Sequence, residues 1–104
     1  MSEAHVNGTI HAQEESTIID ALLPMFRGYK RKMDLELEVE GLDVSIYRDG
    51  DQFLLSGVVL DRTPDETSAL VRKFGQHLEA ARISYSLDLQ QEDKSWERFE
   101  WTPT

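Results

Sequence analysis

Residues 34–60 read DLELEVEGLDVSIYRDGDQFLLSGVVL, and this stretch decides the fold of the chain. Apolar and polar residues alternate along three runs within it, separated by Glu40-Gly41 and Asp49-Gly50. Alternation with a period of two predicts strands with one buried face, and an acidic residue followed by glycine is typical of a tight hairpin turn. The stretch therefore predicts an antiparallel meander of three strands.

The two turns also predict which residues of the meander face the core. A hairpin pivoted on Glu40-Gly41 places Val39 opposite Leu42, and one pivoted on Asp49-Gly50 places Ile46 opposite Phe53. Both pivots agree on one apolar face, and a slip by a single residue would move that whole set to the other side. The predicted core face comprises Leu35, Leu37, Val39, Leu42, Val44, Ile46, Phe53, Leu55 and Val59.

The opposite face of the meander is acidic on its first two strands but apolar on its third. A strand with one solvated face does not normally carry apolar residues on both sides. Either the first helix or the last strand covers the apolar set, or the set is an exposed patch that binds another protein. The residues concerned are Glu36, Glu38, Asp43 and Tyr47 on the first two strands, and Leu54, Val58 and Leu60 on the third.

Two helices are expected to flank the meander. The first should begin near Ser16 or Thr17 and run to Gly28, with Pro24 kinking or ending it. The second should begin at residues 63–66, TPDE, which supply an N-cap, a proline at the first helical position and a glutamate at the third. Gly75 lies at the border of the second helix's apolar face, which indicates close approach of a neighbouring element.

A period of two returns after Arg82 and predicts strands over residues 83–89 and 96–101. The predicted fold class is therefore α+β, with a mainly antiparallel five-stranded sheet and the element order α-β-β-β-α-β-β. Helix two is expected to pack on the core face of this sheet. The chain of 104 residues is predicted to be a single domain, residues 1–104, in which residues 1–13 are disordered or loosely attached.

Composition restricts the partners of the chain more than its fold. Twenty acidic residues against 11 lysines and arginines give a net charge of −9, which opposes binding to nucleic acid or to an anionic membrane surface. No apolar run reaches the roughly 20 residues that a membrane span needs. The absence of cysteine excludes disulfides and thiolate chemistry, and it predicts a cytoplasmic location.

Residues that could carry chemistry are present but are not arranged in a recognisable motif. There is no nucleophile elbow, no glycine-rich phosphate loop and no cluster with metal-ligand spacing, so we predict no catalytic residue, no metal and no cofactor. The predicted function is a non-enzymatic protein-interaction domain, chaperone-, adaptor- or immunity-like, acting as a homodimer or as one half of a complex. The alternative is a small-molecule-binding protein or enzyme, with a pocket between sheet and helices lined by His77, Tyr85 and Trp96.

The predicted order of elements resembles that of class I type III secretion chaperones, which are dimers that hold an extended segment of another protein. The resemblance covers element order, small size and acidity, and it includes no sequence motif. Those chaperones usually end in a further helix, whereas this chain ends in WERFEWTPT, which cannot form one. Element order alone is a weak basis for function, so the sequence does not place the chain in that family.

Overall fold

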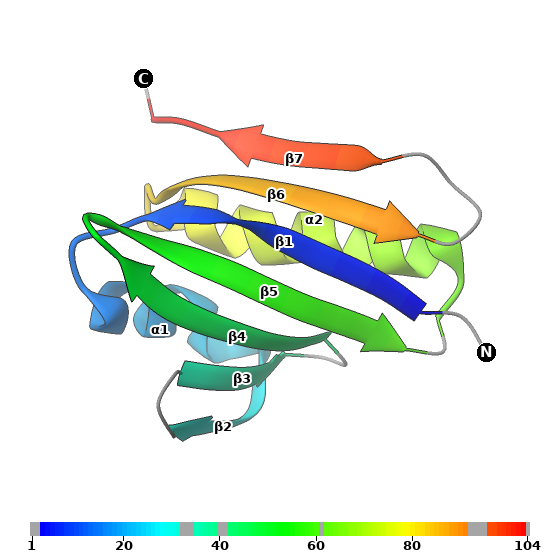
Figure 1. Cartoon of the computed structure of the whole chain (residues 1–104), viewed down its shortest axis with the longest axis horizontal. Coiled ribbons are helices and arrows are strands. Elements are labelled where there is room, and N and C mark those ends of the chain that lie inside the picture. Colours follow the sequence, from blue (N-terminus) through cyan, green and yellow to red (C-terminus); the bar gives the residue numbers. More distant parts are fainter. Residues whose placement is uncertain (1–2, 32–34, 40–41, 61, 92–95, 104) are drawn as a thin grey trace.

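The computed structural model describes residues 3–31, 35–39, 42–60, 62–91 and 96–103. Its elements lie in the order strand, helix, four strands, helix, two strands (Figure 1). The helices are α1 (Glu15–Leu22) and α2 (Pro64–Ala80), and a short 3₁₀ turn, η1 (Leu23–Met25), follows α1 directly. The strands are β1 (Glu3–His11), β2 (Phe26–Arg31), β3 (Leu35–Val39), β4 (Leu42–Asp49), β5 (Gln52–Leu60), β6 (Ser84–Gln91) and β7 (Glu97–Trp101).

All of these strands belong to one seven-stranded sheet in the order β2-β3-β4-β5-β1-β6-β7, and neighbouring strands are antiparallel. Both helices lie behind the sheet in Figure 1, on the same face. The predicted α+β class is confirmed, since the five predicted strands are β3 to β7 and occur with the two helices in the predicted order. β5 and β6 are parallel to each other because both run antiparallel to β1, and α2 connects them across the helix-bearing face.

The first strand corrects the expectation that residues 1–13 are loosely attached. β1 lies in the interior of the sheet and pairs with β5 on one side and with β6 on the other. Its alternate residues Ala4, Val6 and Ile10 are buried in the core, so the segment EAHVNGTIH has the period-two pattern of a half-buried strand. Small side chains and the glycine at position 8 make that pattern weak in the sequence.

The segment after α1 decides between the two outcomes predicted for Pro24, since the helix stops there and does not continue with a kink. The helix ends at Leu22 rather than at Gly28, and Pro24 lies in the 3₁₀ turn that follows. Proline has no backbone N–H to continue the helical hydrogen bonds, which explains why the chain leaves the helix here. Residues 26–31, FRGYKR, therefore form β2 at one edge of the sheet and do not continue the helix.

The predicted register of the meander is confirmed for its first hairpin and shifted for its second. Val39 pairs with Leu42, as the Glu40-Gly41 pivot predicts. In the second hairpin Asp49 pairs with Gln52, so the two-residue turn is Gly50-Asp51, with Gly50 at a positive φ of 67°. The shift relative to the predicted pairing is two residues, which leaves every side chain on its predicted face.

The core lies between the helices and the facing side of the sheet. The described part of the predicted core face is confirmed, since Leu42, Val44, Ile46, Phe53, Leu55 and Val59 are all buried. The helices contribute apolar residues from one side each, and β1 and β6 complete the layer. These further core residues are Ile18, Leu22, Met25, Leu70, Val71, Phe74, Leu78, Tyr85, Leu87 and Leu89, with Ala4, Val6 and Ile10 of β1.

Two local predictions about α2 are also confirmed. Thr63 and Glu66 form a capping box, in which the Glu66 amide donates to Thr63 Oγ1 at 3.1 Å and the Thr63 amide donates to Glu66 Oε1 at 3.0 Å. Gly75 allows the ring of Tyr85 on β6 to approach the helix backbone, because a Cβ at this position would lie 2.7 Å from Tyr85 Cζ. Glycine is therefore needed at position 75 for close packing of helix on sheet.

Candidate functional site

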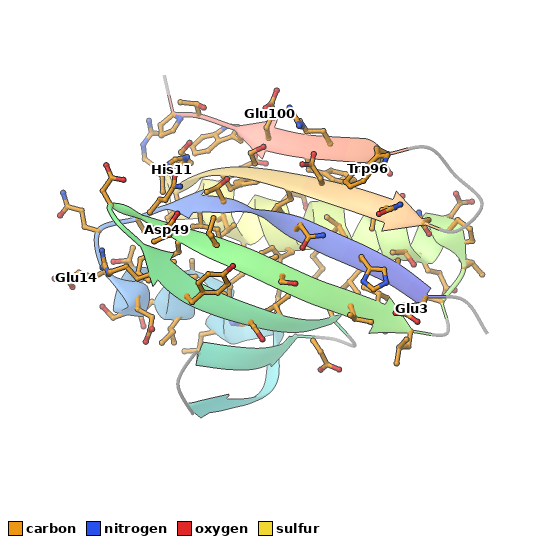
Figure 2. The ribbon with its side chains drawn as sticks, in the orientation of Figure 1. Glu3, His11, Glu14, Asp49, Trp96 and Glu100 are labelled. Atoms are coloured by element: carbon orange, nitrogen blue, oxygen red, sulfur yellow. The ribbon has the colours of Figure 1, made fainter. Side chains whose placement is uncertain are left out.

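The face of the sheet opposite the helices, which we call the outer face, is the candidate site. It is formed by alternate residues of each strand and looks toward the viewer in Figure 2. Cross-strand pairing arranges these residues in rows that run across the sheet. From β4 to β7, one row is Tyr47, Leu54, Thr9, Ser86 and Glu100, and the next is Ser45, Ser56, Asn7, Asp88 and Arg98.

The structure resolves whether the chain itself covers the apolar residues of this face. Both helices pack on the other face, and β7 extends the sheet at its edge, so neither α1 nor the last strand lies over β5. Among the described elements, none packs on the outer face. The apolar set predicted from the sequence is therefore open to solvent on the outer side of the sheet.

The members of this apolar set differ in exposure. Leu60 is 54% exposed and Tyr47 is 40% exposed. Leu54 and Val58 are half-buried, since β4 and β1 flank β5 on both sides. Tyr47 pairs directly with Leu54, so an aromatic ring and a leucine lie side by side at one end of the apolar set, and Ser56 separates them from Val58 and Leu60 along β5.

Acidic side chains surround the apolar set. Glu3, Asp43, Asp49 and Glu100 are exposed on or at the ends of the outer-face strands, and Figure 2 labels three of them. The fifth carboxylate, Asp88, accepts a hydrogen bond of 2.8 Å from Arg98 Nε, and this bond raises the pKa of the Arg98 guanidinium. The described rim of the outer face is therefore mainly acidic.

Glu36 and Glu38 complete the residues that the sequence assigns to this face. Both lie in β3, where Glu36 pairs in register with Ser45 and Glu38 pairs with Asp43. The cross-strand position of Glu38 and Asp43 follows from the predicted pairing of Val39 with Leu42 in the same hairpin. Their side chains lie outside the described part of the structure.

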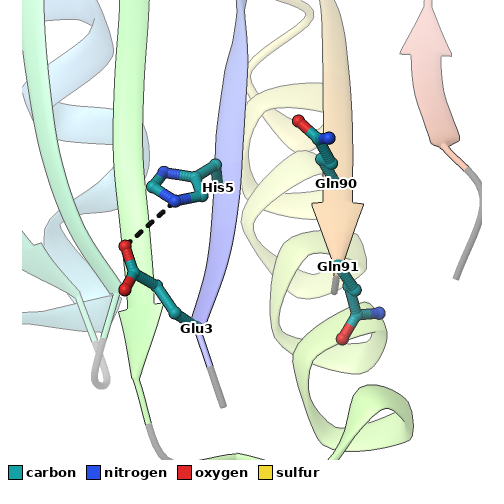
Figure 3. Close-up of a pocket in the computed structure, with 4 residues that line it drawn as sticks. All are labelled: Glu3, His5, Gln90 and Gln91. Carbon is teal, nitrogen blue, oxygen red and sulfur yellow. Dashed lines mark ion pairs between the residues drawn. The ribbon is translucent and has the colours of Figure 1, made fainter. Parts of the chain in front are cut away.

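A shallow polar cavity lies at one end of β1 and β6. Its volume is about 240 Å³, and Glu3, His5, Gln90 and Gln91 line it (Figure 3). His5 Nε2 lies 2.9 Å from Glu3 Oε1, but the two side chains are 50% and 48% exposed. Since solvent reaches both groups, their ion pair is weak, and the geometry of this cavity does not favour acid–base chemistry.

The structure does not bring together the three residues predicted to line a pocket between sheet and helices. Tyr85 is buried beneath α2, where its hydroxyl donates a hydrogen bond of 2.5 Å to Glu79 Oε2. His77 is half-buried on α2, whereas Trp96 precedes β7 and is 60% exposed. Tyr85 pairs with Trp101, at the other end of β7 from Trp96.

The sequence interpretation missed the contribution of β1 to the outer face. His5, Asn7 and Thr9 lie between the apolar residues of β5 and the polar residues of β6. The signal that could have identified them is the alternation of Ala4, Val6, Gly8 and Ile10 with polar residues, which is the pattern of a strand with one solvated face.

Within the described residues, no three histidine, aspartate or glutamate side chains are grouped so that they could hold a metal ion, and no helix is long and apolar enough to cross a membrane. No protein family model, curated protein or solved structure matches this chain. Support for a site therefore comes from the residues of the chain and their geometry.

Proposed function

We propose that this chain is a non-enzymatic protein-interaction domain that binds a partner through the outer face of its meander. The observation that supports this function is the set of Tyr47, Leu54, Val58 and Leu60 on a sheet face over which no described element packs. These apolar side chains form two groups on the same face, Tyr47 with Leu54 and Val58 with Leu60, and exposed Ser56 lies between the groups on β5. Apolar side chains gathered on one open face of a domain are typical of an interface. A cysteine-free acidic chain of this kind fits a reducing cytoplasm.

The charges around the apolar set favour a partner with a basic rim. Exposed carboxylates of Glu3, Asp43 and Asp49 lie around it, and the sequence adds Glu36 and Glu38 from β3. A second copy docked on this face would bring acidic rims together, and like-charge contact disfavours such a complex. A different protein, with lysine or arginine around an apolar centre, would complement the face. An adaptor, a chaperone or an immunity-type inhibitor would each use the face in this way.

The alternative of a small-molecule enzyme has less geometric support. His77, Tyr85 and Trp96 lie apart, and the described cavity on the outer face is shallow and polar. An enzyme site normally combines an enclosed apolar pocket with a few convergent polar groups, and the described residues show no such combination.

The chain offers a matched pair of variants that tests the proposal. Leu60 on the outer face and Leu23 on the helix side are exposed to nearly the same extent, 54% and 58%. Leu60→Glu and Leu23→Glu therefore each replace an exposed leucine with a carboxylate at similar cost to folding. Only Leu60→Glu should weaken partner binding, by about tenfold or more, because it places a charge at an exposed apolar residue of the proposed interface.

The partner can be identified with a photo-crosslinking residue placed at Tyr47 and, as a control, at Leu23. Purified partner is then titrated against wild type and both glutamate variants by calorimetry, with thermal unfolding as the check on folding. We expect crosslinking from position 47, and binding that survives Leu23→Glu but not Leu60→Glu. Equal binding by the two variants, or crosslinking from position 23 alone, would show that the outer face is not the binding surface.

A further inference from the structure

The outer edge of β7 has a charge pattern that fits a second copy of the chain. β7 is the last strand of the sheet order, so its far edge pairs with no other strand among the described residues. An edge strand leaves a row of unpaired backbone N–H and C=O groups that can pair with another strand. We propose that two copies of this chain pair edge to edge through β7, in antiparallel orientation, with Phe99 on the two-fold axis.

The sequence of β7, ERFEW, specifies this register. Arg98 and Glu100 lie on the outer face, one on each side of Phe99. If Phe99 faces Phe99 of the second copy, Arg98 of each copy faces Glu100 of the other. The pairing therefore forms two identical pairs of opposite charge, as a two-fold symmetric interface requires.

Neighbouring registers are disfavoured by the same two residues. A pairing shifted by two residues in one direction places Arg98 opposite Arg98 of the second copy. A shift in the other direction places Glu100 opposite Glu100. Like charges directly opposite each other destabilise a strand pair, so only the Phe99-centred register is complementary. Edge strands that are protected against pairing usually carry charges that repel a second copy of the strand. In the Phe99-centred register, the charges of β7 attract a second β7.

Packing on the helix side of β7 supports the same arrangement. Phe99 and Trp101 point toward the helix layer but are only half-buried, although both pack against the core cluster. Arg72 of α2 lies over the Phe99 ring, with its Cζ 5.7 Å from the ring centroid. A second β7 would cover the open side of both aromatic rings and extend the apolar layer across the two-fold axis. This interface lies at the β7 edge of the sheet, three strands away from the apolar residues of β5, so the two can operate together.

Charge variants test the proposed pairing by sedimentation across a concentration series up to about 1 mM. Wild type should form a dimer of about twice 12.0 kDa. Arg98→Glu and Glu100→Arg should each weaken the dimer by roughly tenfold or more, because each variant places like charges opposite one another. An equimolar mixture of the two variants should restore dimers, since the mixed pair again matches opposite charges. Circular dichroism checks that Arg98→Glu, which also loses its bond to Asp88, remains folded.

Single cysteines provide a second test that does not depend on charge, because the chain has none of its own. Phe99→Cys should form a disulfide between copies under mild oxidation, since the two residues at the axis face each other. Trp101→Cys should not, because the two cysteines would lie about 14 Å apart along the strands. A monomeric wild type at every concentration, or crosslinking that is equal for both variants, would overturn the proposal. Loss of the dimer in Leu60→Glu but not in Arg98→Glu would likewise place self-association on the outer face.

Discussion

Replacing Gly75 by alanine probes the closest approach between helix and sheet. In an exposed helix interior the change would stabilise the protein by ~1 kcal/mol, because alanine has the higher helix propensity. Here the added Cβ would lie 2.7 Å from Tyr85 Cζ and 3.1 Å from Cε2, well inside van der Waals contact. Overpacking of this kind costs ~1–3 kcal/mol. If the ring moved away instead, its hydrogen bond to the Glu79 carboxylate would break, at a cost of ~1.5–3 kcal/mol.

The net expectation is that Gly75→Ala lowers the free energy of unfolding by ~1 kcal/mol in the wild-type background. In a Tyr85→Leu background, where the clashing ring atoms are absent, the same change should raise it by ~1 kcal/mol. The difference is an interaction energy of ~2 kcal/mol between the two positions, which urea denaturation of the four proteins measures directly. If alanine stabilised both backgrounds equally, Tyr85 would not pack over Gly75, and the reasoning would be refuted.

Two further predictions concern the N-terminal cap of α2 and the phenol of Tyr85, which lies beneath this helix. Thr63→Ala removes the hydroxyl that accepts a hydrogen bond from the Glu66 amide, so it should lower the free energy of unfolding by ~1 kcal/mol. Urea denaturation measures this change, and an unchanged midpoint would contradict the role of the cap. Burial, followed by the hydrogen bond and charge of Glu79, raises the pKa of Tyr85 above its ordinary value of 10.0. The contribution of the neutral phenol to stability is complete below pH 10 and is lost as the pH rises toward the folded-state pKa of Tyr85. The free energy of unfolding of wild type should therefore fall more steeply above pH 10 than that of Tyr85→Phe. Parallel thermal melts from pH 8 to pH 11 would show this difference, and identical slopes would argue against it.

The parts of the fold that follow from the sequence are those in which two independent signals agree. In the meander, turn residues and period-two alternation both point to the same buried face, so even a two-residue error in the second hairpin did not change that face. In α2, the cap, the proline and the apolar stripe agree, and the helix begins at the predicted residue. Agreement between local signals is what makes these elements predictable.

The missed strands carry only one signal each. β1 alternates in period two, but alanine and glycine occupy two of its four core-facing positions, and its burial depends on distant neighbours in β5 and β6. Such small residues give a weak local hydrophobic pattern, although tertiary pairing buries Ala4 and half-buries Gly8. In β2, Phe26 continues the apolar stripe of α1, so helical periodicity competes with the stop signal of Pro24. Non-local pairing, which a local pattern does not encode, decides both segments.

The same non-local pairing changes what the apolar outer side of β5 means. From the sequence, apolar residues on both faces of a strand indicate that something must cover it. In the structure β5 is an interior strand, and the adjacent strands β4 and β1 partly bury Leu54 and Val58 from the sides without any cover above them. The surface that a partner could still bury therefore lies mostly at Tyr47 and Leu60, which remain the more exposed members of the set. Binding energy concentrates in side chains that become fully desolvated on association, so Leu60 gives a sharper test of the interface than Leu54.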